Sequence, residues 1–92
     1  MQADFKPTTT EATAAKTIAL PLIRRGDQGQ TVKIAQKILI VNGYLGNESY
    51  DANFGQKTEQ AVKNYQNNHN LAADGVVGMK TWEELIKDIR RS

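Results

Sequence analysis

Cysteine is absent from this chain of 92 residues, and histidine occurs once, at position 69. Without thiols there is no disulfide framework, no thiolate metal site and no cysteine nucleophile. A single histidine is also too few for a histidine-rich zinc site. The carboxylate pair Glu83 and Glu84 is adjacent on a predicted helix and fits a solvated surface better than an acid/base pair. We therefore expect no metal, no cofactor and no enzymatic activity.

Long apolar stretches are absent as well. No segment approaches the roughly 20 apolar residues that span a bilayer, and the N-terminus lacks the charged start and apolar centre of a signal peptide. We expect no insertion into a membrane, and an export signal, if one is used, is not visible in this sequence.

The charge is too evenly spread for a nucleic-acid partner. Residues 1–26 account for the whole net charge of +2, and residues 27–92 contain eight basic and eight acidic side chains. A nucleic-acid binder of this size normally has a clustered basic face, whereas only Lys87, Arg90 and Arg91 cluster here. We expect no binding to nucleic acid.

The N-terminal segment has a composition that does not support a core. Residues 1–20 contain five threonines and five alanines with few bulky apolar side chains, so burial would not offset the entropy of ordering them. We interpret residues 1–21 as a disordered linker or tail and residues 22–92 as one domain. The apolar group from Ile18 to Ile23 contains Pro21, which disfavours helix before it, and we expect it to lie extended over the domain and close its core.

Three segments have helical periodicity. The first runs from about Gln30 to Asn42, the second follows Gly55 and ends at Asn70, and the third follows Gly78. Gly43 and Asn70 are suited to the left-handed residue that ends a helix. The predicted fold is all-α, a small three-helix bundle with an internal helix–loop repeat. The apolar positions expected to face the core are Val32, Ile34, Ala35, Ile38, Leu39, Val41, Thr58, Ala61, Val62, Tyr65, His69, Trp82, Leu85, Ile86 and Ile89.

A short sequence motif occurs twice in the chain. Residues 74–82 repeat the frame of residues 51–59, with Asp, Gly, Lys and Thr at matching positions 23 residues apart. The loop before the first copy is four residues longer, and we expect functional specialisation there. The residues that follow Asp51 do not match the ligand spacing of an EF-hand. We therefore interpret Asp51 and Asp74 as acceptors for backbone N–H groups of a turn. We also expect Gly78→Val to cost stability.

The long loop and the end of the second helix supply the candidate ligand residues. Aromatic side chains in the loop fit core anchoring and ligand contact equally well, and pairing of this loop with another is a further alternative. The polar run 66–70 is either a fraying helix end with a left-handed stop, or a set of amides that recognise sugar hydroxyls and peptide groups. The predicted ligand-binding residues are Tyr44, Tyr50, Asp51, Asn53, Gln66, Asn67 and Asn70.

Many positions match the pattern of a known family. These positions are Gly26-Asp27-Gln28-Gly29, Val32, Gln36, Leu39, Gly43-Tyr44, Asp51, Phe54-Gly55, Thr58, Ala61-Val62, Tyr65-Gln66, Leu71, Asp74-Gly75-Val76-Val77-Gly78, Thr81-Trp82 and Leu85. At this spacing, residues 22–89 resemble the peptidoglycan-binding domain family of bacterial and phage cell-wall hydrolases. The sequence departs from the family at Ala52 and at Asn70, where glycine is usual.

The resemblance implies a three-helix bundle that anchors or targets an attached partner to peptidoglycan without catalysing a reaction. It implies an extracytoplasmic location, in the periplasm or cell wall, a hydrolase domain in the parent protein, and a monomer. Similar bundles also serve as enzyme prodomains or protein-contact modules, which is the alternative function. No residue-by-residue ligand set is implied.

Overall fold

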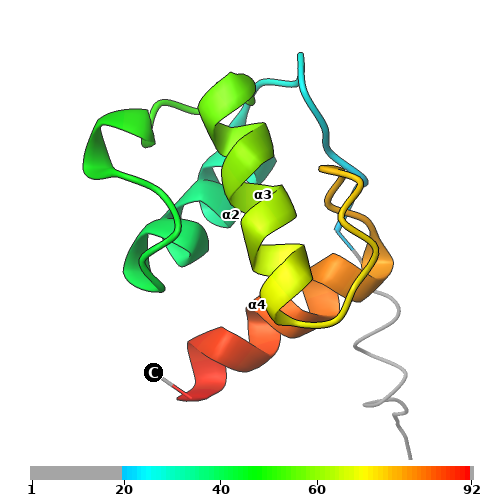
Figure 1. Ribbon diagram of the computed structural model, residues 1–92. Helices are drawn as coiled ribbons and strands as arrows, with labels where there is room; N and C mark the ends of the chain where they lie inside the picture. The colour runs from blue at the N-terminus through cyan, green and yellow to red at the C-terminus, as the bar shows by residue number, and fades with distance from the viewer. Residues whose placement is uncertain (1–19, 92) are drawn as a thin grey trace, which may run out of the picture.

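The computed structural model describes residues 20–91, and the side chains of residues 90 and 91 lie outside that description. It has three helices in chain order, α2 (Gln30–Val41), α3 (Gln56–Asn68) and α4 (Met79–Arg91), and a 3₁₀ turn η1 (Asn47–Ser49) in the long loop. Figure 1 shows α3 crossing in front of α2, with α4 running beneath both. The predicted all-α fold is confirmed, and α3 ends two residues before the predicted Asn70.

The core is small and closed by residues from all three helices and from the loops. Tyr65, Leu39 and Leu85 are the largest apolar side chains that are fully buried, and Trp82 is buried beside them. This confirms the assignment of Tyr65 and Trp82 to the core. The buried apolar residues are Ile23, Val32, Ala35, Ile38, Leu39, Phe54, Ala61, Val62, Tyr65, Val77, Trp82 and Leu85.

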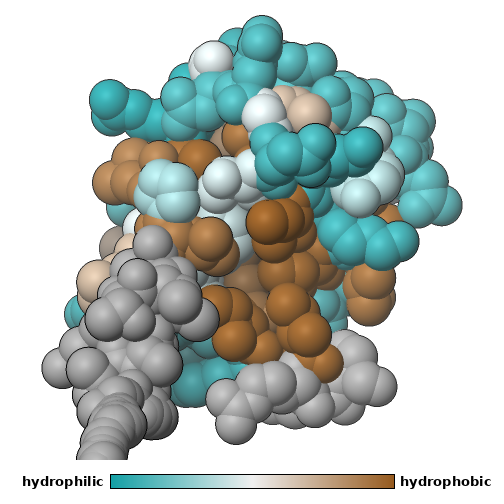
Figure 2. Space-filling model, turned by 180° about the vertical axis from the view of Figure 1, so that it is seen from behind, coloured by the Kyte–Doolittle hydropathy of each residue, from teal (hydrophilic) through white to brown (hydrophobic). Residues whose placement is uncertain are grey.

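The predicted apolar stripes of α2 and α4 are wider than the surface that the bundle covers. Ile34 and Val41 on α2 are 44% and 59% exposed, and Ile86 and Ile89 on α4 are 39% and 51% exposed. The prediction that these four residues are buried was wrong, because a bundle of three short helices leaves part of each helix without a neighbour. Figure 2, which views the molecule from behind, shows apolar side chains gathered over the middle and lower part of that face.

The segment before α2 lies extended across the loops, as predicted. Ile23 pairs with Val77 through two backbone hydrogen bonds, from Ile23 N to Val77 O at 3.2 Å and from Val77 N to Ile23 O at 2.9 Å. The indole nitrogen of Trp82 donates to the carbonyl of Pro21 at 3.0 Å, and Leu20 packs on the core. Leu20, the first described residue, thus already contacts the bundle, and the predicted position of Ile18 lies outside the described part.

The pairing of the long loop with another segment, one of the alternatives left open, is also observed. Gln28 and Asn53 form an isolated antiparallel bridge, and the amide of Phe54 donates to the carbonyl of Asp27 at 2.9 Å. The segment before α2 therefore joins both copies of the repeated loop, the first at Asn53 and the second at Val77. No helix within residues 20–91 is both long enough and apolar enough to cross a membrane.

The residues that end the first two helices have the left-handed conformation that was predicted for them. Gly43 has φ 85° and Asn70 has φ 58°. The next residue then turns back, with Tyr44 N donating to Leu39 O at 2.8 Å and Leu71 N donating to Gln66 O at 2.9 Å, which is the long hydrogen bond of a Schellman motif. By contrast, a Cβ built at Gly78 meets no atom within 4 Å, so a clash of the Cβ is not the cause of the cost that we expect for Gly78→Val.

The two repeated loops share an unusual backbone conformation directly after their aspartates. Ala52 has φ 68° and Gly75, at the matching position, has φ 77°. A left-handed φ costs an L-residue with a Cβ roughly 1–2 kcal/mol, whereas glycine adopts it freely. The first copy of the loop is therefore strained at Ala52, where the family pattern has glycine.

Ala52→Gly should stabilise the protein by about 1 kcal/mol, because it removes this strain at the expense of some unfolded-state entropy. Urea denaturation of the variant and the wild type measures the difference. The control is Ala73→Gly in the second loop, an exposed position without a left-handed φ, which should lose a few tenths of a kcal/mol. An Ala52→Gly variant less stable than the wild type would contradict the assignment of strain.

Candidate functional site

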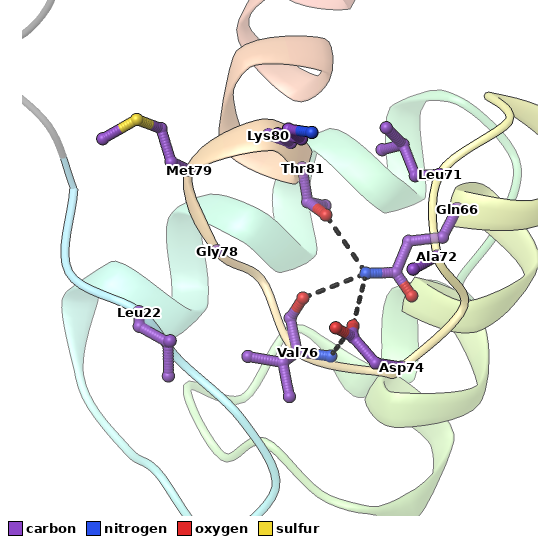
Figure 3. Close-up of a pocket in the computed structure, with 10 residues that line it drawn as sticks. All are labelled: Leu22, Gln66, Leu71, Ala72, Asp74, Val76, Gly78, Met79, Lys80 and Thr81. Carbon is purple, nitrogen blue, oxygen red and sulfur yellow. Dashed lines mark hydrogen bonds between the residues drawn. The ribbon is translucent and has the colours of Figure 1, made fainter.

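A buried glutamine holds each repeated loop against the preceding helix. In the second copy this residue is Gln66 on α3, which is 1% exposed. Its Nε2 lies 3.0 Å from Asp74 Oδ1, 3.0 Å from the carbonyl of Val76 and 3.1 Å from Thr81 Oγ1, and its Oε1 accepts from the amide of Gly75 at 3.0 Å. Figure 3 shows the three bonds from Nε2. One side chain thus joins α3, the loop and the first turn of α4.

Gln36 on α2 makes the same set of contacts in the first copy. Its Nε2 lies 3.1 Å from Asp51 Oδ1, 3.0 Å from the carbonyl of Asn53 and 3.1 Å from Thr58 Oγ1. Its Oε1 accepts from the amides of Asp51 at 3.2 Å and Ala52 at 3.0 Å. The sequence repeat is therefore a structural repeat, in which a helix glutamine fixes the turn that begins the next helix.

The aspartates of the repeated motif accept hydrogen bonds from backbone amides of the turn, as predicted. Asp51 Oδ1 accepts from the amide of Asn53 at 3.0 Å, and Asp74 Oδ1 accepts from the amide of Val76 at 2.9 Å. The hydrogen bond from Asn53, followed by that from Gln36, lowers the pKa of Asp51 below its usual 3.8. Among residues 20–91 no group of three or more acidic or histidine side chains is arranged to hold a metal ion.

These contacts show the surroundings of one predicted ligand residue. Gln66 was assigned to the surface patch at the end of the second helix, but it is buried and both polar atoms of its amide are bonded within the fold. Asn67 and Asn70, its neighbours in the polar run, are exposed. The left-handed conformation of Asn70 explains why the helix ends in polar residues. Only the exposed residues of the run remain available to a ligand.

The remaining predicted residues do not converge on one point. Tyr50 is 43% exposed and lies against α2, with Lys33 Nζ 4.7 Å and Lys37 Nζ 5.6 Å from its ring centroid. Asp51 and Asn53 are joined to Gln36 as described above. Tyr44 instead lies against α3, where its hydroxyl accepts from Asn68 Nδ2 at 2.9 Å.

A pocket of about 300 Å³ opens beside the second copy of the loop. We call it the Gln66 pocket. Figure 3 shows Leu22 and Met79 on one side of it and the bonded group of Gln66, Asp74 and Thr81 on the other. Both hydrogen bonds that the described residues make to the Asp74 carboxylate end on Oδ1, and the residue is exposed. The lining residues are Leu22, Gln66, Leu71, Ala72, Asp74, Val76, Gly78, Met79, Lys80 and Thr81.

This pocket combines an apolar wall with one charge of each sign. Leu22 and Met79 are 57% and 64% exposed, and Lys80 is exposed at the start of α4. An Asp74 Oδ2 acceptor and a Lys80 ammonium next to apolar surface suit a ligand that has both polar ends and aliphatic groups. The sequence did not identify Leu22, Leu71, Met79 and Lys80 as pocket residues, because the repeated motif indicated a turn and gave no sign of a cavity.

A second pocket, of about 270 Å³, lies beside the longer first loop. We call it the Tyr44 pocket. It is bounded by η1 on one side and by the exposed edge of α3 on the other, so the four extra residues of the first loop form part of its wall. The lining residues are Tyr44, Leu45, Gly46, Glu48, Ser49, Lys57, Gln60, Ala61 and Asn64.

A buried polar cluster lies elsewhere, between α3 and α4. Tyr65 donates to Asp88 Oδ2 at 2.6 Å, and His69 Nε2 lies 3.3 Å from the same oxygen. Burial, followed by the hydrogen bond to Asp88, raises the pKa of Tyr65. The His69 ring lies on Tyr65, with 3.9 Å between ring centroids. The cluster fastens the two helices together and takes no part in either pocket.

The comparison with protein families decides the classification. Residues 28–85 match the family model described as "Putative peptidoglycan binding domain". The chain belongs to this family. The matched range contains both glutamine-held loops and all of the residues that form the Tyr44 pocket, so the structural repeat is the repeat of the peptidoglycan-binding domain itself.

Known proteins with this domain are similar over most of the chain. The spore cortex-lytic enzyme of Bacillus cereus is 36% identical over 66 residues, which are 72% of this chain and 25% of that enzyme. The crystal structure of the SleB N-terminal domain superposes with a TM-score of 0.70 at 36% identity, covering 73% of this chain and 90% of that one. The chain thus spans about a quarter of the length of the lytic enzyme.

A third relative was solved with a small molecule. It is a peptidoglycan-binding protein from Clostridioides difficile in complex with glutamine hydroxamate. It is 43% identical with a TM-score of 0.66, and the match covers 71% of this chain and 40% of that one.

Replacing Gln66 with methionine should destabilise the domain by about 3 kcal/mol. Methionine nearly keeps the side-chain volume of glutamine, but the buried amide of Gly75 loses its hydrogen-bond partner. Each unsatisfied buried polar group costs roughly 1–3 kcal/mol. Urea denaturation measures the change. The control is Gln56→Met at an exposed position, which should stay within about 0.5 kcal/mol of the wild type. Equal stability of the two variants would contradict the role of Gln66.

Stability in acid should depend on Asp51. Because its pKa is lowered in the folded state, its carboxylate stabilises the fold above its unfolded pKa, and that contribution is lost as the pH falls through the lower folded pKa. Asp51→Asn should therefore lose less stability than the wild type between about pH 4 and pH 2. Denaturation curves over that range measure the slopes. Parallel slopes for the two proteins would show that Asp51 is not responsible.

Proposed function

We propose that this chain is a non-catalytic module that binds peptidoglycan and holds an attached domain at the cell wall. The observation that supports the proposal most directly is the Gln66 pocket, which offers an apolar wall, the Asp74 carboxylate and the Lys80 ammonium within one small cavity. Peptidoglycan combines sugars with short peptides that have aliphatic side chains and both amino and carboxyl groups. The pocket is complementary to a segment of such a peptide.

The relatives support the same role. The spore cortex-lytic enzyme is named for an action on a cell-wall layer, and this chain corresponds to a quarter of its length, which leaves room there for a separate catalytic domain. The complex of the Clostridioides difficile protein with glutamine hydroxamate recommends amino-acid and peptide fragments as first probes of the Gln66 pocket. Attachment to a hydrolase domain, action outside the cytoplasm and a monomeric state are parts of the proposal.

The wall of the Gln66 pocket is held in place by buried hydrogen bonds, which favours binding of a ligand. Gln66 and Thr81 are buried and bonded to each other at the base of the pocket, so its wall is fixed before a ligand arrives and little ordering entropy is lost on binding. The pocket contains no pair of groups positioned as a nucleophile and a base. A single copy should bind weakly, and tethering to a second domain that also contacts the wall would raise the overall affinity.

The alternative function, a protein-contact module, would use different residues. The exposed apolar side chains of α2 and α4, Ile34, Val41, Ile86 and Ile89, are the surface that such a role would require. They do not line either pocket. Variants on that face and variants in the Gln66 pocket therefore separate the two functions.

The test is sedimentation with purified insoluble sacculi. The wild type should pellet with them, and Met79→Ser combined with Lys80→Ser should bind about three- to tenfold more weakly, since an apolar contact and a charged hydrogen bond are removed. The matched control is Val41→Ser, which changes an apolar side chain of similar exposure (59% against 64%) outside both pockets. A wild type that stays in the supernatant would refute the proposed function, and a stronger effect of Val41→Ser would assign sacculus binding to the exposed apolar surface of α2 in place of the Gln66 pocket.

A further inference from the structure

The Tyr44 pocket lies beside the first copy of the loop and differs in its lining from the Gln66 pocket beside the second copy. Both pockets contain a lysine from the first turn of the following helix, Lys57 in one and Lys80 in the other. In the Tyr44 pocket, however, the helix also contributes Gln60 and Asn64. The positions that match these two residues on α4 are Glu83 and Lys87, which do not line the Gln66 pocket. Both pockets contain one charge of each sign, Glu48 and Lys57 in the Tyr44 pocket, so the pair of side-chain amides is what distinguishes it.

The amides of this pocket are arranged to offer one donor and one acceptor. Gln60 and Asn64 are one helical turn apart on the exposed edge of α3, and Gln60 Nε2 donates to Asn64 Oδ1 at 3.2 Å. That bond aligns the two side chains and leaves Gln60 Oε1 as an acceptor and Asn64 Nδ2 as a donor. A donor and an acceptor side by side suit hydroxyl and N-acetyl groups, each of which both donates and accepts.

An aromatic ring at the pocket is held in place before any ligand binds. The Tyr44 hydroxyl accepts from Asn68 Nδ2 at 2.9 Å, and the ring packs edge-on against the buried Tyr65 with 5.2 Å between centroids. Tyr44 remains partly exposed where it lines the pocket. It thus adds a fixed amphipathic surface to the polar edge of α3, and little rotamer entropy is lost there on binding.

The wall opposite α3 comes from the insertion that distinguishes the two loops. The extra residues form η1, and Ser49 of this turn is buried although it is polar. The second loop is four residues shorter, and α4 begins without such a wall. At about 270 Å³ the pocket is slightly smaller than the roughly 300–1,000 Å³ of drug-sized ligand sites, a size that suits one sugar ring.

We infer that the Tyr44 pocket is a second subsite, which takes an N-acetylated hexosamine of the glycan strand while the Gln66 pocket takes peptide. The inference rests on the proposed function, because it assigns the two chemical parts of peptidoglycan to the two copies of the repeat. It also gives a role to the part of the long loop that differs between the copies.

The test is a titration of the isotope-labelled chain with two probes, followed by the backbone amide signals. The probes are a β-1,4-linked trimer of N-acetylglucosamine and a stem peptide without sugar. The glycan probe should shift signals of Tyr44, Ser49 and Asn64, and the peptide probe should shift those around Asp74 and Met79. A glycan probe that shifts no signals of the Tyr44 pocket, or only those of the Gln66 pocket, would overturn the inference.

A pair of matched variants measures the contribution of the amides. Gln60→Ala combined with Asn64→Ala should weaken binding of the glycan probe about three- to tenfold, the effect of losing one or two hydrogen bonds, and should leave the peptide probe unaffected. The control, Glu83→Ala with Lys87→Ala, changes the matching positions of α4 and should bind both probes as the wild type does. Unchanged glycan binding in the first variant would overturn the inference.

Sedimentation with sacculi separates this inference from the proposed function. If the wild type pellets with sacculi but the Tyr44 pocket does not respond to the glycan probe, the module binds peptidoglycan without this subsite. If the wild type does not pellet, the proposed function fails and the subsite fails with it. All four substituted residues lie on helix surfaces, where alanine favours the helix, and the amide spectrum of each variant verifies that it is folded.

Discussion

Two buried amide groups, those of Gln36 and Gln66, determine how the rest of this domain is arranged. Each amide donates and accepts within a loop that starts the next helix, and each is buried so completely that its hydrogen bonds must be made inside the protein. An unpaired amide in that position would cost more than an ordinary hydrogen bond gains. The geometry of the loop is therefore strongly specified, although the loop has little regular secondary structure.

This constraint explains how so short a chain keeps a single arrangement. A bundle of three short helices has a small core and leaves apolar positions such as Val41 and Ile89 exposed. The two glutamines compensate by fixing where α3 and α4 begin, and the segment from Leu20 to Gln28 bridges both loops through Asn53 and Val77. Polar bonding at the loops and apolar packing at the helices thus specify the same structure.

The same constraint places the candidate binding surfaces. Because the loops are held in place by buried hydrogen bonds, the spaces beside them are preformed, and one pocket with its own lining lies beside each copy of the loop. The first copy contains η1 and a pair of side-chain amides, whereas the second copy has a shorter loop with an apolar wall. A rigid repeated scaffold with variable edges lets one small domain present two kinds of surface.

The sequence by itself determined the helices, their left-handed ends at Gly43 and Asn70, and the turn role of the aspartates, because these depend on residues close together in the chain. The family resemblance was equally visible, since it is a matter of spacing. Only the tertiary structure decided that Gln66 is buried while Asn67 is exposed, because its partners Asp74 and Thr81 come from beyond the end of its own helix. It also decided which apolar positions are covered and where the pockets lie, since both depend on how the three helices pack together.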